Sequence, residues 1–281
     1  GYIMSLYKLI QEKIFNTYEE WHMKSPIYDR NGFNIIGIDN SLKAMRDGYI
    51  TYTEIYPPHD IKCCSLMKAV VGKSKNHVDI YMDIDDKKYW MPDLTYDEAI
   101  KIMRNFVKKS ILPSQGQYFE APPEDNEAIR ESFYDLAKLL LGDSSDSQKF
   151  IGGLKIEGLK DIDNAWEELY EEVLQTKRAF DFDWKTRKDV FIPVLKELIV
   201  NMNLDIDLCK LDELDRNILD QDEAIPQWGA QINSMWTDYI LAGMDVGSDS
   251  YVVLILTRED FAKAKELARG ILQRIALLEE M

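Results

Sequence analysis

The first third of the chain predicts one helix followed by a series of short strands. Apolar residues recur at helical spacing from Leu6 to Trp21, which predicts an opening amphipathic helix of about five turns. Apolar runs separated by turn-forming residues then predict strands over residues 33–38, 49–56, 61–71, 78–84 and 88–91. An antiparallel meander is the simplest topology for such a series.

A helix start signal follows these strands. Thr95 and Glu98 have the spacing of a capping box, in which each side chain bonds to the main-chain amide of the other residue. The apolar residues that follow recur on one helical face, so we predict a helix over residues 95–109. Together with the preceding strands, this helix predicts an α+β first domain.

Proline-containing segments then interrupt the chain. Residues 113–116 and 121–125 each contain proline, and only a short segment separates them. Proline-containing segments so close together are typical of a junction between domains. We therefore predict an α+β fold of two domains, residues 1–122 and residues 123–281, each with a small, mainly antiparallel sheet covered by helices.

The second half alternates helical and strand patterns. The sequence predicts helices over residues 124–141, 163–175, 190–202 and 258–278, and a polar loop over residues 143–147. Apolar and acidic residues alternate over residues 179–184, as they do in a half-buried strand. Pro193 is best accommodated in the first turn of its helix, where a missing N–H group is tolerated.

The clearest local signal is a hairpin between residues 239 and 257. Two apolar runs flank a turn in which Gly247 can supply a positive φ, and the second run is too apolar to face water on both sides. The sequence therefore predicts a buried hairpin. Its turn would bring four polar side chains to one rim, namely Asp245, Ser248, Asp249 and Ser250.

The negative charge of the chain lies entirely in its second half. The formal net charge is −16. Residues 1–122 hold 16 basic and 16 acidic residues, which leaves 18 basic and 34 acidic residues for residues 123–281. Such a field repels nucleic acids and anionic membranes and attracts basic proteins. We therefore predict no nucleic-acid partner and no membrane partner.

The densest acidic run, residues 205–223, is the predicted contact surface for a basic partner. Trp228 follows this run closely, and an exposed aromatic ring beside carboxylates would add contact area to electrostatic steering. We expect it to be partly exposed in a loop. The predicted partner-binding residues are Asp212, Glu213, Asp215, Asp220, Asp222, Glu223 and Trp228.

Cysteine usage and hydropathy predict a cytoplasmic location. The three cysteines form no Cys-x-x-Cys motif, which favours a reducing compartment. The first residues lack the pattern of a secretory signal, and no run reaches the roughly 20 apolar residues of a membrane span. Whether Gly1 to Ile3 are native is left open.

The chain offers few residues for catalysis or metal binding. Its three histidines all lie in the first half, and adjacent Cys63 and Cys64 would point to opposite faces of a strand. Asp83, Asp85 and Asp86 lack the glycine and the distal glutamate of a calcium loop, so a solvated turn is the simpler interpretation. We predict no cofactor and no metal.

Two family resemblances add to this interpretation. Residues 33–120, through Tyr89-Trp90-Met91-Pro92 and Leu94-Thr95-Tyr96-Asp97-Glu98-Ala99, resemble bacterial immunity proteins that protect against deaminase-type toxins, although Tyr118 and Phe119 stand where such proteins tend to carry tryptophan. The second half resembles an uncharacterised bacterial domain family, through Phe182-Asp183-Trp184-Lys185 and the hairpin. The first resemblance implies a protein partner, and the second supports a fold but transfers no activity and no catalytic residues.

The sequence is compatible with three functions. The leading hypothesis is a non-catalytic, immunity-type protein that engages a basic partner, such as a toxin, through its acidic second half. The rival is a carboxylate-based hydrolase or cation-binding enzyme, with Asp245 and Asp249 as acid, base or cation ligands. A structural module that forms oligomers is the third.

Overall fold

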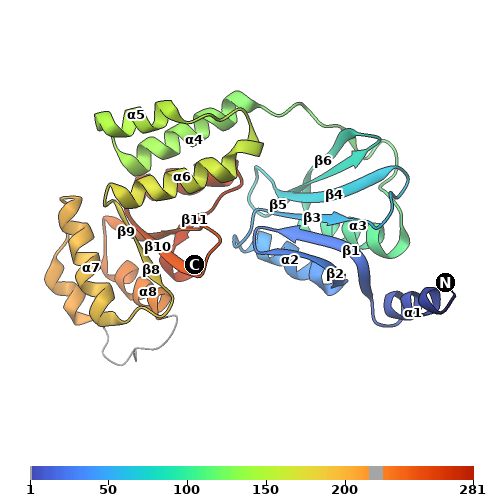
Figure 1. The fold of residues 1–281 in the computed structure, drawn as a ribbon, viewed down its shortest axis with the longest axis horizontal. Coiled ribbons are helices and arrows are strands. Elements are labelled where there is room, and N and C mark those ends of the chain that lie inside the picture. The colour runs from blue at the N-terminus through green and yellow to red at the C-terminus, as the bar shows by residue number, and fades with distance from the viewer. Residues whose placement is uncertain (1, 215–223) are drawn as a thin grey trace. The chain divides into compact units, whose positions relative to one another are not determined.

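The computed structural model describes residues 2–214 and 224–281. The chain divides into two compact units. The first ends at Pro123, and the second begins at Glu124. We call them unit 1 and unit 2. The α+β prediction is confirmed, because each unit combines an antiparallel sheet with packed helices (Figure 1).

Unit 1 is built on sheet A, which has seven strands within the described residues. The strands are β1 (Thr17–Ser25), β2 (Tyr28–Asn34), β3 (Tyr52–Tyr56), β4 (Cys64–Val71), β5 (His77–Ile84), β6 (Lys87–Thr95) and β7 (Phe119–Glu120). Their order is β2-β1-β3-β4-β5-β6-β7, and each neighbouring pair is antiparallel. From β3 to β7 the sheet is therefore the predicted meander.

The helices of unit 1 are α1 (Tyr2–Lys13), α2 (Ile36–Arg46) and α3 (Tyr96–Lys109). The capping box of α3 is confirmed. Thr95 Oγ1 accepts a hydrogen bond from the Glu98 amide, and Glu98 Oε2 accepts one from the Thr95 amide, both at 3.2 Å. Apolar residues of α2 and α3 share one buried core with alternate residues of sheet A, which places both helices on the same face of that sheet.

Two predictions for unit 1 were wrong. The opening helix ends at Lys13, and Tyr18 and Trp21 lie on β1, where both are buried. The strand register shifts between Tyr18 and His22, so the two aromatic side chains three residues apart both enter the core, and their spacing imitates a helix. The predicted strand over residues 33–38 is instead the end of β2 and the start of α2.

Unit 2 contains sheet B, which has four strands within the described residues. These strands are β8 (Ala179–Asp183), β9 (Tyr239–Met244), β10 (Ser250–Thr257) and β11 (Ile275–Leu277). Their order is β11-β9-β10-β8, and every neighbouring pair is antiparallel. The predicted hairpin is therefore the centre of the sheet.

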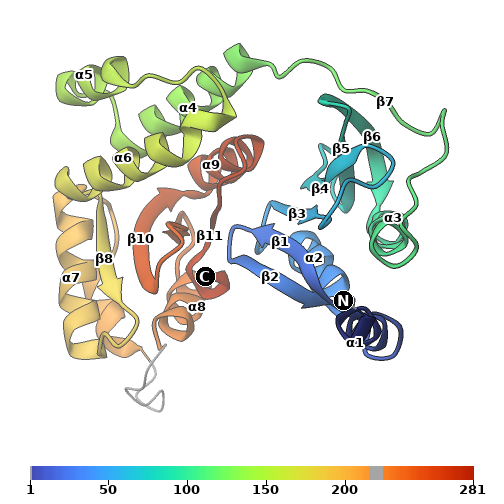
Figure 2. The same ribbon diagram turned by 45° about the vertical axis from the view of Figure 1, so that its right-hand side comes forward.

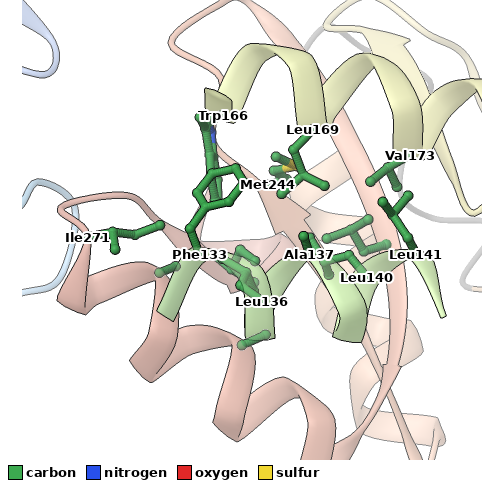
Figure 3. Packing of buried hydrophobic residues seen from close by; sticks show 14 of the residues in the cluster. Phe133, Leu136, Ala137, Leu140, Leu141, Trp166, Leu169, Val173, Met244 and Ile271 are labelled. Carbon is green, nitrogen blue, oxygen red and sulfur yellow. The ribbon is translucent and has the colours of Figure 1, made fainter. Parts of the chain in front are cut away.

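Helices cover both faces of sheet B. They are α4 (Asn126–Leu141), α5 (Ser145–Gly153), α6 (Ile162–Gln175), α7 (Lys188–Asn201), α8 (Ile225–Met235) and α9 (Arg258–Gly270), with short 3₁₀ turns η1 (Leu159–Asp161), η2 (Leu208–Glu213) and η3 (Leu278–Glu280). Ala242 and Met244 enter a core with α4, α6 and α9, which is drawn in Figure 3. Leu241 and Val253 enter a second core with α7 and α8, on the opposite face (Figure 2).

Three predictions for unit 2 were wrong. Residues 145–147, predicted as part of a loop, are the first turn of α5, because Ser144 caps this helix by accepting a bond from the Ser147 amide. The helix predicted to reach residue 278 ends at Gly270. Strand β11 follows it and pairs with the edge of β9 that does not pair with β10. Pro193 is the sixth residue of α7, beyond its first turn.

Candidate functional site

In the described part of the acidic run the acidic side chains are exposed, and one of them is paired with a lysine. Asp212 and Glu213 lie in η2, and both side chains are exposed. Asp212 Oδ1 accepts a bond of 2.8 Å from Lys196 Nζ of α7, which neutralises part of this surface. Four further predicted contact residues lie outside the described residues, namely Asp215, Asp220, Asp222 and Glu223.

The prediction that Trp228 is exposed was wrong. Trp228 lies in α8 and is completely buried, with its ring centroid 5.2 Å from that of Phe191. Pro226 stands in the first turn of α8, so the segment that follows the acidic run begins a helix and does not form a loop. The indole therefore stabilises the core of unit 2 and cannot contact a partner directly.

At the hairpin rim, Asp245 is held by the fold. Its Oδ1 accepts a bond of 3.0 Å from the Gly247 amide, and its Oδ2 lies 3.3 Å from Nη1 of Arg274. Its main-chain oxygen accepts a further bond of 2.8 Å from Trp166 Nε1. Both carboxylate oxygens are thus engaged in closing the turn and joining β9 to β11. This arrangement gives Asp245 a structural role.

The other rim residues form no cluster with Asp245. Ser248 Oγ accepts a bond from the Ser250 amide, which tightens the turn, and Asp249 is exposed. No interaction of the Asp249 carboxylate is found within residues 2–214 and 224–281. Over the same residues, no three His, Cys, Asp or Glu side chains are placed to share a metal ion. The geometry therefore offers no support for the rival enzyme.

A different acidic surface lies on α6. One side of this helix is buried through Ile162, Ala165, Trp166, Leu169 and Val173. The opposite side is exposed and carries Asp163, Asn164, Glu167, Glu168 and Glu171, with Glu172 half-buried beside them. The helix contains no lysine or arginine. We call these six residues the α6 acidic face.

This face is unfavourable for the helix that carries it. Glu167 and Glu171 are four residues apart, as are Glu168 and Glu172, and like charges at this spacing destabilise a helix by about 0.2–0.5 kcal/mol per pair. Acidic residues near the helix C-terminus also oppose the macrodipole. The burial of the other side holds the helix in place. Apart from Asp163, which lies in the first turn and favours the macrodipole, the acidic residues of this face therefore do not stabilise α6.

Tyr170 joins the α6 acidic face to the edge strand of sheet B. Its hydroxyl donates a bond of 2.5 Å to Asp181 Oδ2 on β8. Burial, the bond to Asp181 and the nearby charge of Glu171 raise the pKa of Tyr170 to about 12. Because the phenol stays protonated at neutral pH, it remains a donor and keeps the Asp181 carboxylate beside the helix.

Sequence reasoning missed this face although its signal was present. The helix over residues 163–175 was predicted, and the motif Glu167-Glu168-Leu169-Tyr170-Glu171-Glu172 is visible within it. Residues 205–223 have a higher density of acidic residues, so the predicted contact surface was placed there and not on this helix. The link to Asp181 could not be predicted, because it depends on the packing of α6 against β8.

Unit 2 also contains a pocket. It has a volume of about 450 Å³ and is formed by α8, β9, the first turn of α9 and the segment from β11 to η3. Its lining residues are Ala230, Asn233, Ser234, Ile240, Arg258, Phe261, Leu277 and Glu279. The pocket therefore combines apolar walls with one basic and one acidic side chain.

Comparison with known proteins identifies the family of the second half. A family model described as a domain of unknown function, DUF6630, matches residues 118–278, which is 161 of the 281 residues. The chain belongs to the DUF6630 family. The α6 acidic face, the hairpin and the pocket lie within the match, apart from Glu279. No curated protein and no solved structure matches the chain.

The comparisons support the interpretation of the second half but not that of the first. The expectation that the second half belongs to a domain family without an assigned activity is confirmed. The match leaves residues 1–117 outside, and nothing supports the resemblance of residues 33–120 to immunity proteins. In the described part of the chain, no helix has the length and apolar character needed to cross a bilayer.

Proposed function

We propose that this chain is a non-catalytic binding protein that engages a basic protein partner through the acidic surface of unit 2. The observation that carries the proposal is the α6 acidic face, where exposed carboxylates gather on a helix without a lysine or arginine. Asp181 extends the surface onto β8. Asp212 and Glu213 of η2 form a separate acidic patch, because η2 packs into the core on the opposite face of sheet B.

The energetic cost of this surface supports a binding role. Like-charged pairs four residues apart weaken α6 in isolation, and a cationic partner placed against them would reverse the sign of that effect. The surplus of acidic residues in the second half adds a long-range field that raises the rate of encounter with basic proteins. An acidic surface used in this way steers association and depends strongly on salt.

The identity of the partner is a finer proposal. The resemblance of residues 33–120 to immunity proteins suggests that the partner is a basic toxin in the bacterial cytoplasm. The choice of the α6 acidic face as the contact surface is independent of this resemblance.

Charge reversal on α6 tests the proposal. We expect the double variant Glu167→Lys/Glu171→Lys to reduce the association rate with a basic partner at least about tenfold at low ionic strength. The partner would be captured by cross-linking in a lysate of the source organism and identified by mass spectrometry. Its association would then be measured by surface plasmon resonance at low and high salt.

The matched control is Glu127→Lys/Glu131→Lys on α4, another exposed pair at the same spacing and with the same change in net charge. We expect this control to slow association by less than about threefold. Equal effects of the two variants would show that only net charge matters and would contradict a contact on α6. Failure to capture any basic protein in a salt-dependent manner would also contradict the proposal.

A further inference from the structure

The pocket of unit 2 contains a guanidinium group that the main chain holds in place. Arg258 is the first residue of α9, and its Nη2 donates a bond of 2.9 Å to the main-chain oxygen of Trp236. Its Nε donates to the main-chain oxygen of Thr237. These two carbonyl groups follow the end of α8. Since guanidinium has five N–H donors, donors remain for a ligand after both bonds are made.

The same pocket contains a carboxylate that is held in a similar way. Glu279 Oε2 accepts a bond of 2.7 Å from Asn233 Nδ2. Asn233 is itself fixed, because its side chain bonds to both the amide and the carbonyl of Leu241 on β9, at 2.7 and 2.9 Å. Glu279 Oε1 has no partner within residues 2–214 and 224–281. One acceptor of known position therefore remains available.

Most of the remaining lining is apolar. Ile240 of β9 is buried, and Phe261 and Leu277 are half-buried. A pocket of about 450 Å³ lies within the range of small-molecule sites, which typically combine apolar walls with a few fixed polar groups. Groups that are oriented before binding lose less entropy when a ligand arrives.

We propose that this pocket binds a small zwitterion of the amino-acid class with an apolar side chain. The ligand carboxylate bonds to Arg258, its ammonium group bonds to Glu279, and its side chain packs against Ile240, Phe261 and Leu277. A ligand with only one charge leaves either the remaining donors of Arg258 or the second oxygen of Glu279 without a ligand partner. This site is separate from the α6 acidic face and does not depend on the proposed function.

Titration calorimetry with the full chain tests the site. The probes are L-leucine, L-phenylalanine and the dipeptide leucyl-leucine, and their capped counterparts are N-acetyl-leucine and leucine amide. We expect at least one zwitterionic probe to bind, and each capped form of leucine to bind at least about tenfold more weakly than leucine. Absence of binding by all three zwitterions up to about 10 mM would overturn the proposal.

Two variants test which charged group of the ligand each side chain binds. We expect Glu279→Gln to remove the preference for leucine over N-acetyl-leucine, and Arg258→Gln to remove the preference for leucine over leucine amide. Glu280→Gln is the matched control, because Glu280 is exposed, adjacent to Glu279 and not part of the lining. If a variant unfolds, as judged by circular dichroism, binding of the capped probes to the native chain still tests the proposed site. Equal binding of capped and free forms would overturn the assignment.

Discussion

At the scale of single residues, burial decides which side chains are available for function. Trp228 was a good sequence candidate for a contact residue, yet it is fully buried, and no partner is found within the described residues for its indole N–H. Asp245 was a good candidate for chemistry, yet Gly247 and Arg274 engage both of its carboxylate oxygens. Tyr170 drew no attention in the sequence, and it proves to connect two acidic segments.

The pKa of Tyr170 provides a test at this scale. Burial and Asp181 raise it to about 12. We expect Asp181→Asn to lower it toward the usual value of about 10, while burial keeps it somewhat above that value. Because the folded pKa exceeds the unfolded one, the phenol's contribution to stability is complete below about pH 10 and is lost as the pH rises through about 12.

The measurement is an NMR titration of the chain with ¹³C-labelled tyrosine, in which Tyr170→Phe identifies the signal. At about pH 11 the Tyr170 signal should show more ionisation in Asp181→Asn than in the native chain. Asp183→Asn, on the same strand, is the control and should leave the signal unchanged. An unchanged pKa in Asp181→Asn would contradict the hydrogen bond.

At the scale of elements, local signals predicted what forms but not always where it ends. The helix over residues 95–109 was predicted correctly, because its capping box involves only residues three positions apart. The helix predicted from residue 258 was made too long, because Ile271 and Ile275 continue a helical spacing. Residues 275–277 instead form β11 on β9, a pairing that no local pattern encodes.

The contact between α8 and η3 provides a test at this scale. A Cβ atom at Gly229 would lie 2.9 Å from Cβ of Leu278, which is fully buried. We expect Gly229→Ala to destabilise unit 2 by about 1–3 kcal/mol, because overpacking outweighs the better helix propensity of alanine. The free energy of unfolding, measured by urea denaturation, checks this expectation.

Gly152 in α5 is the matched control for this substitution. It also lies in a helix, but no atom would come within 4 Å of a Cβ there. We expect Gly152→Ala to stabilise the chain by about 0.5–1 kcal/mol. If both variants were stabilised, the close packing of α8 against η3 would be wrong.

At the scale of the whole molecule, the two units have separate cores. One core consists only of residues from Tyr18 to Val107, and the other two consist only of residues from Phe133 to Leu278. The family match also begins close to the division between the units. Each unit therefore holds the apolar contacts that it needs for its own stability.

We expect the fragment 124–281 to fold without unit 1. It should give a dispersed ¹H–¹⁵N NMR spectrum and unfold cooperatively in urea, because both of its cores are complete. The fragment 1–123 serves as the counterpart with a single core. A collapsed NMR spectrum of fragment 124–281 would show that its stability depends on unit 1.

The sequence alone determined the α+β class, the central hairpin, the capped helix α3 and the concentration of negative charge in the second half. These features depend on composition or on residues close together in the chain. Tertiary structure decided the burial of Trp228, the pairing of Asp245 with Arg274, strand β11 and the link from Tyr170 to Asp181. Each of these depends on which distant segments pack together, and local spacing carries no information about that choice.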